Sequence, residues 1–204
     1  MSGTQRIESP RLWLIRHGAT EWSLRGTHTG RRTDLPLLPE GQAEAKKLAE
    51  YLRGYAFAAV FTSPLRRARE TADLCGLGQR AEVLPDLVEW DYGDYEGKTH
   101  VEIRQTNPTW AIFRDGCPGG ESPAAAAARL DRVLAEVTSR FTGGDGDIAI
   151  FSHGHTLRVL ALRYLGWPLE AGAQLLLDTT AVCRIKEERG RRSMELWNDR
   201  SHLR

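Results

Sequence analysis

Near its start the chain reads Leu12-Trp13-Leu14-Ile15-Arg16-His17-Gly18-Ala19-Thr20, an apolar run that ends abruptly in Arg-His-Gly. A short apolar run of this kind, bounded by a glycine, is typical of a strand buried on both faces of a parallel sheet. Open α/β sheets bind their ligands outside the carboxyl ends of such strands. We therefore predict a strand over 11–16 that delivers Arg16 and His17 to a ligand, with Gly18 letting the backbone approach it.

A second strand end repeats this pattern. The apolar run over 147–151 leads into Ser152-His153-Gly154-His155-Thr156 and then into a predicted helix through about 165. Two histidines that each follow a buried strand and precede a glycine are hard to explain by packing alone. The repeat indicates a site at the carboxyl edge of the sheet.

A third strand is predicted over 58–62, followed by Ser63-Pro64. Serine and proline are favoured at the N-cap and first position of a helix, so we expect a helix over about 64–75. Arg66, Arg67 and Arg69 fall near its start, where cations oppose the helix dipole but reinforce an anion site. A solvated basic face is the alternative.

An acidic and aromatic stretch, Glu89-Trp90-Asp91-Tyr92-Gly93-Asp94-Tyr95-Glu96-Gly97, follows the next predicted strand at 81–84. This composition favours a packed loop over a helix. A carboxyl group held against an aromatic ring or another carboxylate tends to keep its proton, which makes it a candidate general acid. The residues alone do not say which of the four carboxylates has this role, and a solvated acidic turn stays open.

The remaining pattern alternates helices and strands. Helices are predicted over 39–53 and 123–141, and two edge strands over 181–186 and 194–197. Such alternation predicts an α/β fold of three layers, α/β/α, with a mostly parallel open sheet and helices on both faces. We expect a single domain over 1–204, with a small lid insertion at about 90–123.

Composition restricts the possible partners. The chain of 204 residues has 28 Lys and Arg against 27 Asp and Glu, a formal charge of +1 that predicts no nucleic-acid or membrane partner. No apolar stretch is long enough to cross a bilayer, and no signal-peptide core is seen, so we expect a cytoplasmic protein. Three widely spaced cysteines without a Cys-x-x-Cys pair indicate neither zinc nor redox chemistry.

The residues gathered at the predicted sheet edge suit phosphoryl transfer through a covalent histidine: Arg16, His17, Arg66, Glu89 and His153. An imidazole can attack phosphorus, guanidinium groups and a cationic histidine can neutralise the phosphoryl oxygens, and a carboxylic acid can protonate the departing alkoxide. No metal is needed for this chemistry. A metal site formed by His17, His153 and His155 is the alternative, which the arginine charges disfavour.

Four blocks of this sequence resemble the signature blocks of the histidine phosphatase superfamily, the phosphoglycerate mutase-like fold. These blocks are Leu14-Ile15-Arg16-His17-Gly18-Ala19-Thr20, Thr62-Ser63-Pro64-Leu65-Arg66-Arg67-Ala68-Arg69-Glu70-Thr71, Glu89 with Tyr92-Gly93-Asp94-Tyr95-Glu96-Gly97, and Ser152-His153-Gly154-His155. Within the superfamily, Thr29-Gly30, Thr33-Asp34-Leu35-Pro36-Leu37 and Asp115-Gly116-Cys117-Pro118-Gly119-Gly120-Glu121-Ser122 look most similar to small bacterial acid phosphatases and sedoheptulose-bisphosphatase-like enzymes.

The resemblance implies roles for individual residues. It implies His17 as nucleophile, Glu89 as proton donor, and Arg16, Arg66 and His153 as the phosphate pocket. Substrate-binding positions are expected at Ser23, Thr29, Gly30, Tyr92 and Gly154. The resemblance further implies no cofactor and no metal, a small phosphorylated metabolite as the partner, and a monomer or homodimer.

The chain departs from the family pattern at several points. Ser23 stands where many relatives have asparagine, and its hydroxyl can still donate to phosphate but has a shorter reach. Ala19 stands where the mutases have glutamate and the chain is shorter than those mutases, and both points favour a phosphatase. We therefore predict a metal-independent phosphatase acting on small, sugar-like phosphomonoesters; the alternatives are a cofactor-dependent phosphoglycerate mutase and a non-catalytic phosphate-binding module. Specificity is expected from Trp22, Tyr92, Trp110 and Arg114. An acidic or near-neutral pH optimum is expected.

Overall fold

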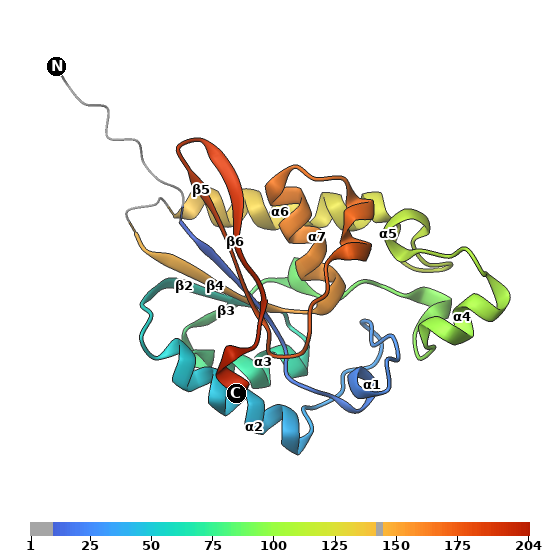
Figure 1. The fold of residues 1–204 in the computed structure, drawn as a ribbon, viewed down its shortest axis with the longest axis horizontal. Helices are drawn as coiled ribbons and strands as arrows, with labels where there is room; N and C mark the ends of the chain where they lie inside the picture. Colours follow the sequence, from blue (N-terminus) through green and yellow to red (C-terminus); the bar gives the residue numbers. More distant parts are fainter. Residues whose placement is uncertain (1–9, 142–144) are drawn as a thin grey trace.

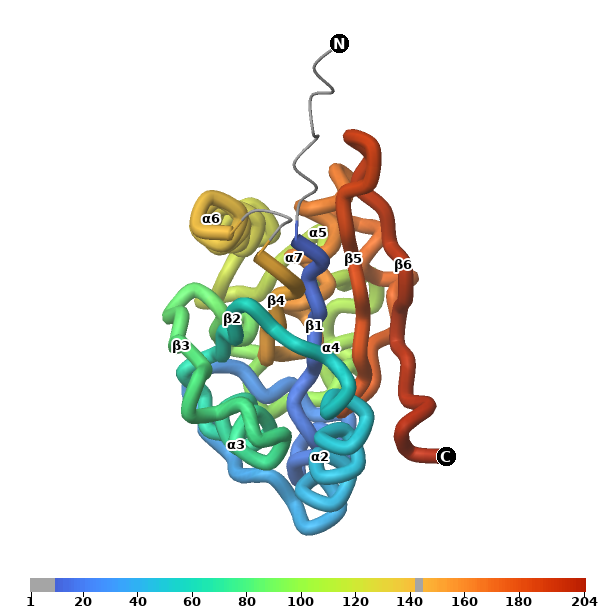
Figure 2. The backbone as a smooth tube through the Cα atoms, turned by 90° about the vertical axis from the view of Figure 1, so that its left-hand side faces the viewer, coloured from blue at the N-terminus to red at the C-terminus, as the bar shows by residue number. Residues whose placement is uncertain are grey.

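The computed structural model describes residues 10–141 and 145–204. A six-stranded sheet in the order β3-β2-β4-β1-β5-β6 crosses the molecule (Figures 1 and 2). The strands are β1 (Leu12–Arg16), β2 (Phe57–Thr62), β3 (Ala81–Val83), β4 (Asp147–Ser152), β5 (Val182–Glu188) and β6 (Arg191–Asp199). Strands β1 to β4 are parallel to one another, β5 is antiparallel to β1, and β6 is antiparallel to β5.

Helices cover both faces of the sheet, as the sequence predicts. In Figure 1, α6 and α7 lie on one face and α2 and α3 on the other. The helices are α1 (Glu21–Leu24), α2 (Pro39–Leu52), α3 (Arg66–Leu74), α4 (His100–Thr106), α5 (Ile112–Asp115), α6 (Pro123–Arg140) and α7 (Gly154–Leu165). Short 3-10 turns lie at Gly78–Arg80, Pro85–Leu87, Gly93–Tyr95, Leu169–Gln174 and Ser201–Leu203.

Strand β1 is buried on both of its faces. Leu12 and Leu14 pack into the core beneath α6 and α7, whereas Trp13 and Ile15 pack into the core on the side of α2. All four side chains are fully buried. This double burial explains why the strand reads as a continuous apolar run in the sequence.

Two local predictions are wrong. Strand β5 lies between β1 and β6, so the described edges of the sheet are β3 and β6. Helix α3 begins at Arg66 after Leu65, and no side chain caps it. Ser63 is thus not its N-cap, because its hydroxyl is used in the site described below.

The expected lid, residues 90–123, packs onto the main core. Its side chains Trp90, Ile103, Trp110 and Phe113 are buried in the same cluster as Leu12 and Leu14. Figure 1 places α4 and α5 together at one end of the molecule. Within the described ranges, no helix combines the length and the apolar character needed to cross a membrane.

Candidate active site

The carboxyl ends of β1, β4 and β2 bring three polar residues together. The backbone N–H of His17 donates to Ser152 O at 3.0 Å, and that of Ser63 donates to Phe151 O at 2.9 Å. These bonds extend the parallel ladder past the strand ends and fix their register. His17 and His153 consequently face each other, with ring centroids 5.2 Å apart.

The side chain of His17 is buried and presents one free ring nitrogen. Its Nδ1 lies 2.7 Å from Gly18 O, a carbonyl that can only accept, so Nδ1 carries the proton and Nε2 has the lone pair. Burial lowers the pKa of His17 well below its usual value, and the charges of Arg67 and Arg16 lower it further. The imidazole is therefore neutral at neutral pH and suited to nucleophilic attack.

His153 is also buried and is held by Ser63. Its Nε2 lies 2.7 Å from Ser63 Oγ, which already accepts a hydrogen bond from the Leu65 N–H at 3.2 Å. The Nδ1 of His153 is buried and has no partner among the described residues, and in the tautomer in which Ser63 donates to Nε2 this Nδ1 carries the ring proton. Burial and the nearby Arg67 lower the pKa of His153, so the cationic histidine expected from the sequence is a neutral donor here.

Arg67, and not Arg66 as predicted, is the arginine of helix α3 whose charge acts on His17 and His153. The Arg66 side chain is 58% exposed and pairs with Glu70, Nε to Oε1, at 2.6 Å. Arg67 is fully buried, and its Nη2 donates to the carbonyls of Thr29 and Gly30 at 3.1 Å each. Its Nε has no partner among the described residues, and its charge acts on both His17 and His153. Arg67 is thus the second phosphate-binding candidate.

Arg16 lies against the start of α7. Its Nη1 donates to Leu177 O at 2.5 Å, and its buried Nε has no partner within the described part of the chain. A Cβ at Gly154 would lie 3.4 Å from the Arg16 guanidinium carbon. The glycine therefore leaves room for the guanidinium beside the N-terminus of α7, where an anion is favoured.

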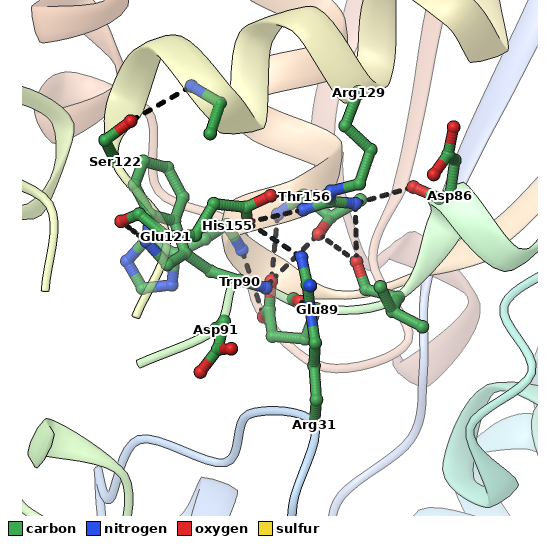
Figure 3. A network of polar contacts seen from close by, with 12 residues as sticks. Arg31, Asp86, Glu89, Trp90, Asp91, Glu121, Ser122, Arg129, His155 and Thr156 are labelled. Atoms are coloured by element: carbon green, nitrogen blue, oxygen red, sulfur yellow. Dashed lines mark hydrogen bonds and ion pairs between the residues drawn. The ribbon is translucent and has the colours of Figure 1, made fainter. Parts of the chain in front are cut away.

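Glu89 is the carboxylate that lines the cavity. Figure 3 shows the polar contacts around it. Its Oε1 accepts from the backbone N–H of Trp90 at 2.9 Å and of Thr156 at 3.0 Å, and its Oε2 accepts from the His155 N–H at 3.2 Å. By contrast, Asp91 accepts from Gly93 N, and Glu96 holds the backbone of the 30–34 loop. Of the four candidates, Glu89 is the one among the described residues that lines the cavity.

Arg16, His17 and Glu89 line a cavity of about 260 Å³. Its wall is made by the ends of β1 and α7, by the 23–29 loop and by Glu89 and Tyr92. The lining residues are Arg16, His17, Ser23, Gly26, Thr27, His28, Thr29, Glu89, Tyr92, Gly154, His155 and Arg158. The cavity joins segments that lie far apart in the sequence.

Several lining residues were not predicted as site residues. His155 Nδ1 lies 2.6 Å from the Tyr92 hydroxyl oxygen, and its ring stacks on His28 with centroids 6.0 Å apart. Arg158 donates through Nε to Gly154 O and through Nη1 to Gly172 O. A sequence signal existed for Arg158, because it lies four residues after Gly154 and hence on the same face of α7.

Other predicted binding residues behave differently. Ser23 and Thr29 line the cavity, but the Ser23 hydroxyl oxygen accepts from the Thr20 backbone N–H at 2.8 Å and so completes the cap of α1. Gly30 does not line it; a Cβ there would lie 2.8 Å from Glu96 Oε2. Gly18 serves packing and not ligand approach, because its Cβ would lie 2.7 Å from Gly41 O in α2.

Of the four side chains expected to set specificity, only Tyr92 is among the lining residues of the cavity. Tyr92 lines the cavity, whereas Trp110 is buried and donates through Nε1 to Gly116 O at 2.8 Å. Arg114 pairs with Asp115 on the surface, and Trp22 lies beside Gly97. The 23–29 loop and α7 supply most of the wall instead.

The three histidines considered for a metal site do not act as one group. His17 faces His153, whereas His155 is bonded to Tyr92 and packed among aromatic rings. Among residues 10–141 and 145–204, no group of three or more His, Cys, Asp or Glu side chains is placed to hold a metal ion.

Comparison with known proteins identifies the family. The family model described as "Histidine phosphatase superfamily (branch 1)" matches residues 12–200. This chain belongs to the histidine phosphatase superfamily. An acid phosphatase of Mycobacterium tuberculosis is 36% identical over 92% of this chain and 92% of its own length.

Other members of the superfamily are similar as well. A sedoheptulose 1,7-bisphosphatase of Saccharomyces cerevisiae is 37% identical over 78% of this chain and 68% of its own. A solved structure of a Mycobacterium tuberculosis protein superposes with a TM-score of 0.86 at 35% identity, covering 93% of this chain and 97% of that one. A 2,3-bisphosphoglycerate-dependent phosphoglycerate mutase of Cytophaga hutchinsonii is 30% identical over 75% of this chain and 76% of its own. These matches confirm the predicted family, fold class and phosphatase type of enzyme.

Proposed function

We propose that this histidine phosphatase hydrolyses small, sugar-like phosphomonoesters without a metal, through a phosphohistidine formed on His17. The observation that carries the proposal is the neutral His17 imidazole, with its Nε2 unprotonated, beside the guanidinium groups of Arg16 and Arg67 and the Glu89 carboxyl. A nucleophile, a source of positive charge and a proton carrier are thus supplied by protein side chains.

The reaction is proposed in two balanced steps. His17 Nε2 forms a bond to phosphorus as the ester P–O bond breaks, and the leaving oxygen takes a proton from Glu89. Water then attacks phosphorus, the N–P bond breaks and returns its electron pair to Nε2, and Glu89 takes a proton from the water. The Nε–H of Arg16, the Nε–H of Arg67 and the Nδ1–H of His153, which lack partners among the described residues, are the proposed phosphoryl donors.

The part of the cavity wall formed by His28, His155 and Arg158 suits a substrate with a second polar or acidic group. Burial lowers the pKa of Arg158 to about 10, so its guanidinium is still charged at neutral pH. Burial lowers the pKa values of His28 and His155, which leaves two neutral imidazoles beside the Tyr92 hydroxyl. The charged Arg158 could bind a second phosphate or a carboxylate of the substrate, and the neutral imidazoles and the Tyr92 hydroxyl could hydrogen-bond to sugar hydroxyls.

The test is release of inorganic phosphate from a panel of sugar mono- and bisphosphates, p-nitrophenyl phosphate and 3-phosphoglycerate, in the presence of EDTA. We expect turnover that resists the chelator and is lost in His17→Ala. Rapid quenching should trap phosphate on the wild-type protein and none on the variant. Turnover abolished by EDTA, or retained by His17→Ala, would contradict the proposal.

A phosphoglycerate mutase is the second candidate, because mutases are among the relatives. The same phosphohistidine would then be returned to a second substrate instead of water. Formation of 2-phosphoglycerate from 3-phosphoglycerate, without net phosphate release, would support that function over hydrolysis.

A further inference from the structure

We propose that Arg31 is a positioning residue for the proton donor Glu89, an inference that rests on the proposed function. Arg31 lies outside the cavity lining, in the loop that follows Thr29 and Gly30. Its Nε donates to the backbone carbonyl of Glu89 at 2.8 Å. It acts on the catalytic carboxyl through the main chain.

The segment that carries Glu89 is held by side-chain donors at four consecutive carbonyls. Arg129 Nη1 donates to Asp86 O at 2.5 Å and to Val88 O at 2.9 Å, and Ser152 Oγ donates to Leu87 O at 2.7 Å. Arg31 completes the series at Glu89 O. Since β3 ends at Val83 and gives this segment no ladder, these bonds take the place of strand pairing.

A buried carboxylate couples the two arginines. Both guanidinium nitrogens Nε and Nη2 of Arg129 contact the two oxygens of Glu121 at 2.8 Å, and Arg31 Nη2 lies 2.9 Å from Glu121 Oε2 (Figure 3). Glu121 and Arg129 are almost fully buried, while Arg31 is 31% exposed. The ion pair between Arg129 and Glu121 does not depend on Arg31, so replacing Arg31 leaves no buried charge unpaired.

Arg31 differs from the other donors in what it connects. It joins the Glu89 backbone to the loop whose Thr29 carbonyl accepts from the phosphate-binding candidate Arg67. The proton donor and the phosphate pocket are thereby fixed relative to each other. Because proton transfer to a leaving group requires close alignment, release of this anchor should weaken general-acid catalysis more than phosphate binding.

The test compares two esters of similar shape whose leaving groups differ in basicity. Phenyl phosphate needs a proton on its departing oxygen, whereas p-nitrophenyl phosphate releases a stable anion. For Arg31→Met we expect kcat/KM for phenyl phosphate to fall about 10-fold more than kcat/KM for p-nitrophenyl phosphate, a small part of the 10²–10⁴-fold that general-acid catalysis supplies. The ratio of two rates on one preparation does not depend on how much of the variant folds.

Two controls make the result specific. Arg132→Met removes an exposed arginine that pairs with Asp86, Nε to Oδ2, at 2.9 Å, and should leave the ratio unchanged. In a Glu89→Gln background, Arg31→Met should not change the ratio further, because the group it positions is gone.

The outcomes separate this inference from the proposed function. An equal loss on both esters in Arg31→Met, or the same change of ratio in the Glu89→Gln background, would overturn the positioning role while the wild-type turnover keeps the phosphatase proposal intact. A wild-type protein that releases phosphate from neither ester would overturn the proposed function, and the inference with it.

Discussion

The His17 and His153 rings face each other across 5.2 Å, centroid to centroid, at the ends of the neighbouring parallel strands β1 and β4. Both are buried beside Arg16 and Arg67, whose charges, with burial, lower both histidine pKa values. The arginines thus have two roles. They keep the imidazoles neutral in the free protein, and they present the charge that a phosphoryl group requires.

Stability should fall on mild acidification because of these buried histidines. The pKa values of His17, His153 and His155 lie well below 6.5 in the folded state, so as pH falls below about 6.5 the unfolded chain takes up protons that the folded chain does not. Each should remove at most about 1.4 kcal/mol of unfolding free energy per pH unit. Urea unfolding between pH 6.5 and 5.5 should show a shallower decline in His153→Gln than in the wild type. Equal slopes would contradict this account.

Activity should be greatest at acidic or near-neutral pH. The lowered pKa of His17 keeps its Nε2 unprotonated below pH 6.5, so the nucleophile stays available there. In the proposed mechanism the leaving oxygen takes a proton from a general acid, a step that should slow as the pH rises. A profile of kcat/KM for phenyl phosphate from pH 4 to 9 should therefore fall on its alkaline side; a rate that rises steadily to pH 9 would show that Glu89 is not the acid.

Arg66 and Arg67 should differ sharply on substitution. We expect Arg67→Met to lower kcat/KM by about 10²-fold or more, because it removes a buried phosphate donor. Arg66→Met removes an exposed ion pair with Glu70 and should cost less than about 3-fold. Steady-state kinetics with p-nitrophenyl phosphate, alongside thermal unfolding of both variants, measure the contrast. Comparable losses of kcat/KM in the two variants would show that Arg66 contributes to the site after all.

Arg158 should discriminate among substrates. We expect Arg158→Gln to raise KM about 10-fold for a sugar bisphosphate, because it removes a positive charge from the cavity wall. The KM for p-nitrophenyl phosphate, which carries no second acidic group, should change less than about 3-fold. The same variant protein serves both assays, so a uniform rise in both KM values would indicate a general defect and exclude this role.

Gly41 should be required for packing of the loop after β1. A Cβ at Gly41 would lie 2.4 Å from Ala19 O, so Gly41→Ala should destabilise the fold by about 1–3 kcal/mol although alanine favours helices. Gly54→Ala is the matched control, since no atom lies within 4 Å of its Cβ position, and it should be neutral or slightly stabilising. Thermal unfolding of both variants is the measurement; similar midpoints would contradict the close contact.

The sequence by itself determined the strands and the two strand-end histidines. Continuous apolar runs at β1 and β4 can only be buried on both faces, and a glycine after each histidine marks where the strand ends. These are local features, because a short stretch of neighbouring residues determines both the burial of the strand and the backbone conformation at its end. The choice of Glu89 was not local, and came from the resemblance to the histidine phosphatases.

Helix phase could also have corrected the choice of arginine. Arg67 shares a face with Ala68, Thr71 and Ala72, all buried, whereas Arg66 lies on the exposed side of α3. The 3.6-residue period carried this information. The prediction of Arg66 rests on the cluster of arginines at the helix start and does not use this period.

Only the tertiary structure decided which loops close the cavity and what holds Glu89. Arg31 and Glu89 are 58 residues apart, and Tyr92 and His155 are 63 apart. No local pattern specifies such pairs, because they depend on the order of strands in the sheet and on how the connecting segments pack over its edge. Local sequence fixes which residues are buried, whereas the packing of distant segments fixes which buried residues meet.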